Sequence, residues 1–239
     1  MPTKIECLEA LASHLLDGFL ALRERYALLD PMLFDPNVVS MRGLGKQARG
    51  FLALRHSLFL ACVQDIAKFS VDTDPRTPSI RNISSALDDV LFIQDLRERY
   101  AIWHLPSIKW ETDPEIVEAL RRIELREQSE RRTQFDELYW ELTALSGRLE
   151  AAPIIAAFRT IRDKLTAHTE VRFVADKYQL IDISALGIKW VDLKTTIVEM
   201  QRAVELIGLI VRNAGFAWDM LDEQLSRAAS NFWLCDAAN

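Results

Sequence analysis

Residues that interrupt or cross-link a chain are scarce in this sequence. Its 239 residues include only eight glycines, eight prolines and three cysteines. Few glycines and prolines, together with long apolar periodicity, indicate helices rather than many short strands. The cysteines, Cys7, Cys62 and Cys235, lie far apart without any C-x-x-C pair. A zinc knuckle and a redox motif are therefore not expected, and a reducing cytoplasm is the expected compartment.

The sequence also has no apolar run long enough to cross a bilayer. The densest run, residues 51–63, is short and is interrupted by Arg55 and His56. The N-terminus carries Glu6 and Glu9 and has no basic segment before an apolar stretch, so a signal peptide is not expected. We therefore expect a protein without membrane contact.

Basic charge and the common catalytic motifs are lacking as well. The net charge is −6, which does not favour a dedicated DNA coat or a polybasic membrane binder. Transient contact with a few phosphates needs only a local basic cluster and stays open. There is no glycine-rich phosphate loop, H-E-x-x-H pair or G-x-S-x-G elbow. Neither a cofactor nor a metal is expected.

Long segments do carry apolar residues at steps of three and four. The first begins at Thr3 and Glu6, which fit a capping box, and is expected to end at Asp30-Pro31. Further helices are expected over about 39–69, 79–100, 114–149, 153–168, 192–215 and 217–234. The pattern predicts an all-α protein, an antiparallel bundle of about six to eight helices in a single domain over residues 1–239.

Several details of these helices are predicted too. Residues 51–63 are apolar almost all round, which predicts a central, buried helix. Within it, Arg55 and His56 face a groove or a buried carboxylate, or alternatively line the same site as residues 162–168. Caps are expected at Ser79, Asp192 and Gly215, and Val90 and Leu91 are expected to point inward, as is Leu96.

Residues 102–134 stand apart from the regular stripes. An irregular connector, with His104 at its solvent edge, leads to Asp113-Pro114, a strong helix start. Residues 126–134 then have no apolar side chain, so a long helix either projects into solvent or breaks near Ser129. The arginines here form either a solvated, self-paired face or a contact surface for RNA or a partner. They are Arg121, Arg122, Arg126, Arg131 and Arg132.

The heptapeptide 162–168, Arg-Asp-Lys-Leu-Thr-Ala-His, is the strongest candidate site. It closes the helix that begins at Pro153 and precedes a loop over 169–189, where weak alternation around 171–174 allows a short extended piece. An arginine fork suits a phosphate oxygen, and a histidine moves protons near neutral pH. On a straight helix Arg162 and His168 lie about 240° apart, so they meet only if the helix ends or a second protomer contributes.

Residues 161–169, Ile-Arg-Asp-Lys-Leu-Thr-Ala-His-Thr, resemble the R-x(4–6)-H motif of the HEPN superfamily, and especially its AbiU-type abortive-infection branch. The dense segment 53–60 before an Asp/Pro/Ser loop is similar to that branch as well. The resemblance implies a homodimeric, metal-independent toxin endoribonuclease for phage defence. Its motifs would face each other across the two-fold axis, with RNA as substrate and an antitoxin protein as partner.

Carried over by position, Arg162 would stabilise the scissile phosphate and His168 would act as the acid/base group. Asp163 would fill the polar position that orients them. One departure is Glu170, because HEPN toxins silenced by nucleotide transfer usually carry a tyrosine there. Two alternatives stay open: a non-catalytic helical interaction protein, and a nucleotide- or RNA-binding module with Arg162 as its anion anchor.

Overall fold

The computed structural model describes residues 3–166, 171–174, 177–180 and 186–234. His168 and Glu170 lie outside these ranges. The helices up to the long one are α1 Lys4–Phe34, α2 Pro36–Arg42, η1 Gly45–Gln47, α3 Ala48–Val71, α4 Ile80–Ala86, α5 Val90–Ala101 and η2 Pro106–Lys109. The remaining elements are α6 Pro114–Ala151, α7 Pro153–Ile161, η3 Arg162–Thr166, β1 Val171–Val174, β2 Lys177–Leu180, α8 Trp190–Arg212 and α9 Trp218–Leu234.

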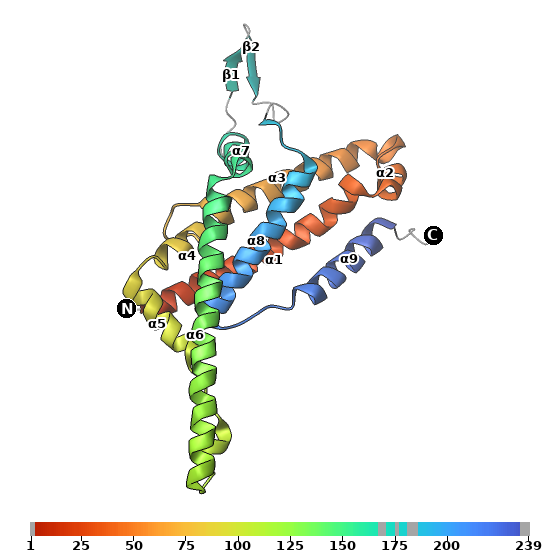
Figure 1. Ribbon diagram of the computed structural model, residues 1–239. Coiled ribbons are helices and arrows are strands. Elements are labelled where there is room, and N and C mark those ends of the chain that lie inside the picture. The colour runs from red at the N-terminus through yellow and green to blue at the C-terminus, as the bar shows by residue number, and fades with distance from the viewer. Residues whose placement is uncertain (1–2, 167–170, 175–176, 181–185, 235–239) are drawn as a thin grey trace.

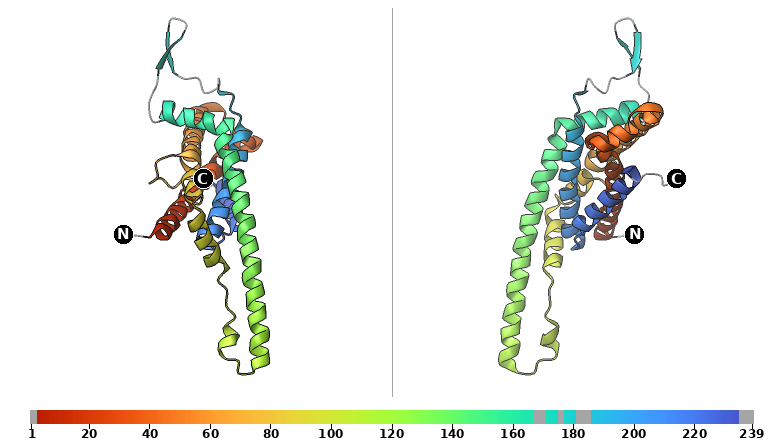
Figure 2. Two further views of the ribbon diagram at one scale, coloured as in Figure 1. Left: turned by 60° about the vertical axis from the view of Figure 1, so that its left-hand side comes forward. Right: turned by 90° about the vertical axis from the view of Figure 1, so that its right-hand side faces the viewer.

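The predicted all-α bundle is confirmed (Figure 1). Helices α1, α3 and α8 pack against one another at its centre, while α6 lies along α8 and α9 covers α1. The described part contains nine α-helices, more than expected, because two predicted helices are each divided. It also includes a small antiparallel hairpin in which Val171 of β1 pairs with Leu180 of β2. The hairpin lies beyond the end of α7 (Figure 2).

Helix α1 follows its predicted start but not its predicted end. The capping box is confirmed, since the Glu6 amide donates to the Thr3 hydroxyl and the Thr3 amide donates to the Glu6 carboxylate. The predicted stop at Asp30-Pro31 is wrong, because Pro31 lies inside the helix. Met32 is fully buried in a small apolar cluster with Phe51 and Trp233. Burial of that side chain stabilises the last turn against the helix-breaking effect of proline.

The helix expected over 39–69 is divided into α2 and α3. The chain bends between them at Gly45, whose φ of +67° favours glycine. The prediction of a buried helix over residues 51–63 is wrong for its first half. Leu52 and Leu54 are 47% and 41% exposed, because the bundle covers only one side of this part of α3.

The helix expected over 79–100 is also divided. Ser79 caps α4 as predicted, but Asp89 caps a separate helix, α5, with its carboxylate accepting from the Leu91 and Phe92 amides. The inward orientation predicted for Val90 and Leu91 is wrong. Both side chains lie in the exposed first turn of α5.

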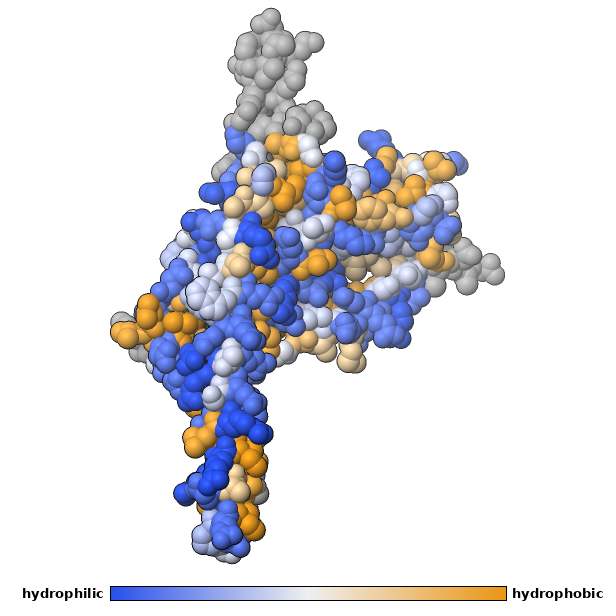
Figure 3. Space-filling view, in the orientation of Figure 1, coloured by the Kyte–Doolittle hydropathy of each residue, from blue (hydrophilic) through white to orange (hydrophobic). Residues whose placement is uncertain are grey.

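Helix α6 is unbroken at Ser129, and its first half projects from the bundle beside residues 102–113 (Figure 2). We call residues 102–134 the arm. Only a few polar contacts hold its two sides together. Gln128 Nε2 donates to the Trp103 carbonyl at 3.0 Å, and His104 pairs with Glu124. Figure 3 shows apolar side chains on the surface of the arm, in which Ile102, Ile116, Ile123 and Leu125 are exposed.

Helix α8 has the predicted buried stripe but different ends. It begins one residue after Lys189, so Asp192 lies in its first turn, where its carboxylate accepts from the Lys189 amide. It ends at Asn213, which has a left-handed φ of 49°, rather than at the expected Gly215. Asparagine tolerates this conformation better than other residues with a side chain. No helix in the described ranges is both long and apolar enough to span a membrane.

The core location of Cys62 leads to a first prediction. Burial raises the pKa of its thiol to about 12, whereas Cys7 is exposed. In a Cys7→Ser/Cys235→Ser variant, iodoacetamide at pH 8 should leave Cys62 unmodified in the native protein and alkylate it fully in denaturant. The unfolded thiol ionises near pH 9 and the folded one does not, so stability should fall as pH rises from about 9 to 12. Rapid native alkylation would contradict this burial.

Candidate functional site

The heptapeptide 162–168 follows α7, a short helix held firmly on α3. Pro153 occupies the first turn, as predicted. Ile155, Phe158 and Ile161 form its buried face, and α7 packs along α3. The start of the heptapeptide is therefore anchored by a rigid element rather than carried on a free loop.

The α-helix does not continue through the heptapeptide. It ends at Ile161, and residues 162–166 form a single π-helical turn, η3, which also packs against α3. Such turns are rare and occur frequently at functional sites. The described part of the heptapeptide therefore does not continue the α-helical geometry of α7.

Two carboxylates hold the Arg162 side chain. Its Nε donates to Asp163 Oδ1 at 2.8 Å, and its Nη1 lies 3.5 Å from Asp72 Oδ2. The guanidinium is partly buried, with 21% of the side chain exposed. Asp163 also pairs with Arg159 one turn earlier, at 3.8 Å. These contacts orient the guanidinium at a partly exposed position on the surface.

Asp72 belongs to an ordered loop at the end of α3. Its Oδ1 accepts from the Asp74 amide at 3.0 Å, and its carbonyl accepts from the buried Ser79 hydroxyl at 2.9 Å. Asn82 binds the Asp74 and Thr77 carbonyls, which closes the loop. Hydrogen bonds from Arg76 lower the pKa of Asp74 to about 2, so this carboxylate stays ionised.

Two of the three candidate residues, Arg162 and Asp163, are in direct contact. His168 lies outside the described residues, so a meeting of His168 with Arg162 stays a prediction. Reasoning from the sequence missed Asp72 as a partner of Arg162. The Asp/Pro/Ser composition of 72–79 signals an ordered turn, but no local pattern connects it with a residue 90 positions later.

The other candidate residues are arranged differently. The Arg55 guanidinium lies 6.0 Å from the centre of the Trp190 ring, and His56 is exposed. In the arginine cluster, Arg122 pairs with Glu118 and Arg126 with Glu130. The last two members, Arg131 and Arg132, contact the Tyr100 carbonyl and Glu98 respectively. Arg122 and Arg126 therefore follow the self-paired interpretation, whereas Arg131 and Arg132 are half-buried and contact α5.

No group of three or more histidine, cysteine, aspartate or glutamate side chains placed to hold a metal ion occurs in the described ranges. His104 pairs with a single carboxylate, that of Glu124, at the arm. The candidate chemistry in these ranges therefore centres on Arg162 and its two aspartates.

Comparison with known proteins assigns this arrangement to a family. A sequence model of the HEPN_AbiU2 family, described as AbiU2, matches residues 5–232. The chain belongs to the HEPN_AbiU2 family. The match covers α1 to α9, so the bundle, the arm and the heptapeptide all belong to the family domain. No curated protein and no solved structure matched the chain.

Membership in HEPN_AbiU2 confirms the resemblance inferred from residues 161–169. It identifies the chain as a HEPN domain of the abortive-infection type. Within this domain the described motif residues lie at the end of α7, on the side where η3 meets α3 and the loop 72–79.

Proposed function

We propose that this HEPN_AbiU2 domain is an endoribonuclease that cleaves RNA without a resident metal and acts as a toxin in phage defence. The observation that carries the proposal is the placement of Arg162. Its guanidinium is oriented by Asp163 and Asp72 on a π-helical turn anchored by α7. A fixed arginine fork at a partly exposed site is well suited to hold a phosphate oxygen.

In the proposed reaction, the 2′-hydroxyl of the RNA attacks the adjacent phosphorus. The O2′–P bond forms, the P–O5′ bond breaks, and the products are a 2′,3′-cyclic phosphate and a 5′-hydroxyl end. A base takes the 2′-hydroxyl proton and an acid protonates the leaving O5′. Arg162 stabilises the charge that develops on the phosphate, and His168 serves as an acid/base group. Asp163 positions Arg162 through the hydrogen bond to its Nε.

The proposed active form is a homodimer with the two motifs facing across the two-fold axis. One histidine cannot give and receive both protons at once, so a second copy of the motif supplies the complementary acid or base. An antitoxin protein is the expected partner that restrains the toxin. Glu170 stands at the position where a modifiable tyrosine would be needed. Restraint through binding is thus favoured over nucleotide transfer.

A second candidate function is a non-catalytic interaction module. The arm favours it, because Trp110 and Leu125 expose 84% and 65% of their surface on a segment that projects from the bundle. An apolar projection of this kind suits contact with another protein. In this reading Arg162 would act only as an anion anchor.

Expression toxicity and RNA cleavage distinguish the two functions. Wild-type protein should arrest growth and cut RNA into fragments with cyclic phosphate ends, in the presence of EDTA as well as without it. His168→Ala should lose roughly 10²–10⁴-fold in cleavage rate, the usual contribution of a general acid or base. His14→Ala is the matched control, since His14 is exposed on α1. Equal cleavage by His168→Ala and wild type would leave only the interaction module.

A further inference from the structure

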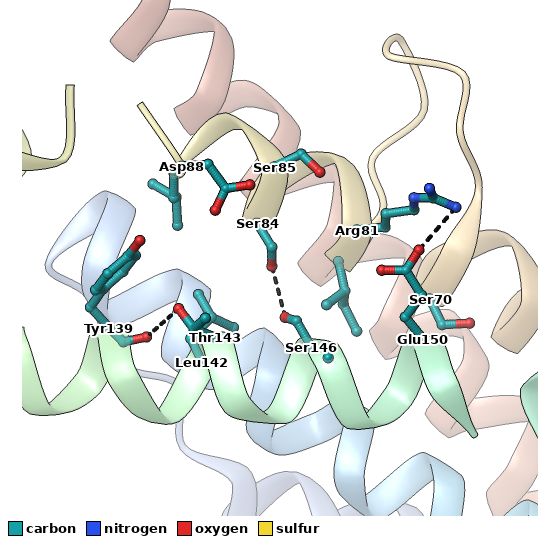
Figure 4. Close-up of a pocket in the computed structure, with 13 residues that line it drawn as sticks. Ser70, Arg81, Ser84, Ser85, Asp88, Tyr139, Leu142, Thr143, Ser146 and Glu150 are labelled. Carbon is teal, nitrogen blue, oxygen red and sulfur yellow. Dashed lines mark hydrogen bonds and ion pairs between the residues drawn. The ribbon is translucent and has the colours of Figure 1, made fainter. Parts of the chain in front are cut away.

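A pocket between α4 and α6 lies apart from the motif residues. Its volume is about 160 Å³ (Figure 4). The inner wall is apolar and consists of Ile80, Leu87 and Leu142. Gly147 of α6 leaves it open, because a Cβ atom there would meet no neighbour within 4 Å. A glycine within a long helix is unfavourable, and here the missing side chain leaves the pocket open to solvent.

The polar groups of the pocket are distributed along its length. Arg81 and Glu150 form an ion pair of 3.2 Å at one end, and Asp88 and Tyr139 lie at the other (Figure 4). Between them the Ser84 and Ser146 hydroxyls are 2.8 Å apart. These hydroxyls can each donate and accept, so a ligand can replace their mutual hydrogen bond with two of its own.

Asp88 differs from the other charged groups of the pocket. Within the described ranges its carboxylate has no ion pair and no side-chain hydrogen bond, whereas Arg81 and Glu150 neutralise each other. An ionised carboxylate only accepts hydrogen bonds. The pocket therefore combines an apolar wall, an aromatic side chain and a free acceptor pair, which fits a flat heterocycle with two adjacent N–H donors.

The pocket is also connected with the motif. Ser70 lines it from α3 and Ile80 lines it from α4, and these two residues flank the loop 72–79. The same loop carries Asp72, the partner of Arg162. Eleven residues separate Glu150 at the pocket from Arg162, and nine of them form α7. At 1.5 Å per residue, α7 is about 14 Å long, so a short stretch of RNA could bridge the two places.

We propose that this pocket binds a guanine base. Guanine presents its N1–H and its 2-amino group side by side, and these two donors match the two oxygens of the Asp88 carboxylate. Its O6 carbonyl can accept from Ser84 or Ser146, and its face lies against Leu142 and the Tyr139 ring. Adenine, cytosine and uracil each lack this adjacent pair of donors and can satisfy only one carboxylate oxygen.

The charge balance of the pocket supports recognition of the base rather than the phosphate. Asp88 and Glu150 outnumber Arg81, so an anion is not drawn inside. The base belongs either to the RNA substrate or to a free guanine nucleotide. In the first case the inference rests on the proposed ribonuclease function and makes the pocket its specificity site.

Binding measurements on the His168→Ala protein test the proposal with cleavage suppressed. By calorimetry, GMP should bind about tenfold more tightly than IMP, which lacks the 2-amino group, because a hydrogen bond to a charged acceptor is lost. AMP should bind no better than IMP. Asp88→Asn should abolish the preference for GMP, because the amide replaces one acceptor with a donor.

Gly147→Met fills the pocket and should abolish GMP binding, whereas Gly50→Met, at another open helical glycine, should leave it intact. Two RNA oligonucleotides that are identical except at one position, which holds guanosine in one and inosine in the other, show whether the base comes from RNA or from a free nucleotide. If the protein binds the guanosine RNA more tightly than the inosine RNA, and Gly147→Met removes this difference, the pocket is a substrate site. If the protein distinguishes GMP from IMP but does not distinguish the two RNAs, the pocket is a nucleotide site. The proposal is overturned if neither GMP nor the guanosine RNA binds, if GMP and IMP bind with equal affinity, or if Gly147→Met binds GMP with the wild-type affinity. None of these outcomes depends on whether the protein cleaves RNA.

Discussion

Arg162→Ala is expected to lower the rate of RNA cleavage by about 10²–10³-fold, the usual cost of removing one group that stabilises transition-state charge. Most of the loss should appear in kcat, because the charge on the phosphate develops after substrate binding. Arg162→Lys should also be strongly impaired, since an ammonium cannot reproduce a fork that engages Asp163, Asp72 and a phosphate together. Single-turnover cleavage of a labelled RNA measures both variants.

Two comparisons make this result specific. Arg227→Ala removes an exposed arginine of α9 that pairs with Glu223, and it should cleave RNA at the wild-type rate. Arg162 also contributes to folding through its ion pairs, so circular dichroism and the urea midpoint must confirm that Arg162→Ala is folded. A folded Arg162→Ala with wild-type cleavage would refute the proposed role of the guanidinium.

Phe158→Ala is expected to cost about 3–5 kcal/mol of folding free energy, the range for deletion of a large buried aromatic side chain. Phe158 is completely buried, and it belongs to the apolar face of α7, the helix that packs along α3. The loss is a large fraction of the roughly 5–15 kcal/mol by which native proteins are stable. Urea denaturation should show a lower midpoint with little change in slope.

The matched control is Trp140→Ala, at another large aromatic on a helix. Trp140 is 70% exposed on α6, so its removal should change the folding free energy by no more than about 0.5 kcal/mol. Equal midpoints for Phe158→Ala and Trp140→Ala would mean that α7 is not anchored as described. Because α7 supports η3, cleavage by Phe158→Ala should be lost at urea concentrations where Trp140→Ala is still active.

Local signals in the sequence were sufficient for most of the helices. The stripe of α1, the Thr3 capping box and the proline starts at Pro114 and Pro153 are all confirmed. Each depends on residues within a turn or two of one another. The errors arose where distant residues decide the outcome. Pro31 was expected to end a helix, but Met32 is buried in a cluster with Trp233, two hundred residues later.

The candidate site shows the same division. The contact between Arg162 and Asp163 could be predicted from the sequence, because the two residues are adjacent. The ion pair with Asp72 was not, because it depends on how α7 crosses α3. The π-helical turn over 162–166 was likewise not predicted, because no local pattern in the sequence distinguishes it from a continuing α-helix.

The arm leaves and re-enters the bundle at a single place. Arg131 Nε donates to the Tyr100 carbonyl at 2.9 Å, and its guanidinium lies over the Tyr100 ring. Everything between these two residues is topologically an insertion: its length does not set the register of any bundle helix. Insertions, deletions and surface substitutions in the arm should therefore leave the bundle unchanged. The motif residues at the opposite end of the bundle should be unaffected as well.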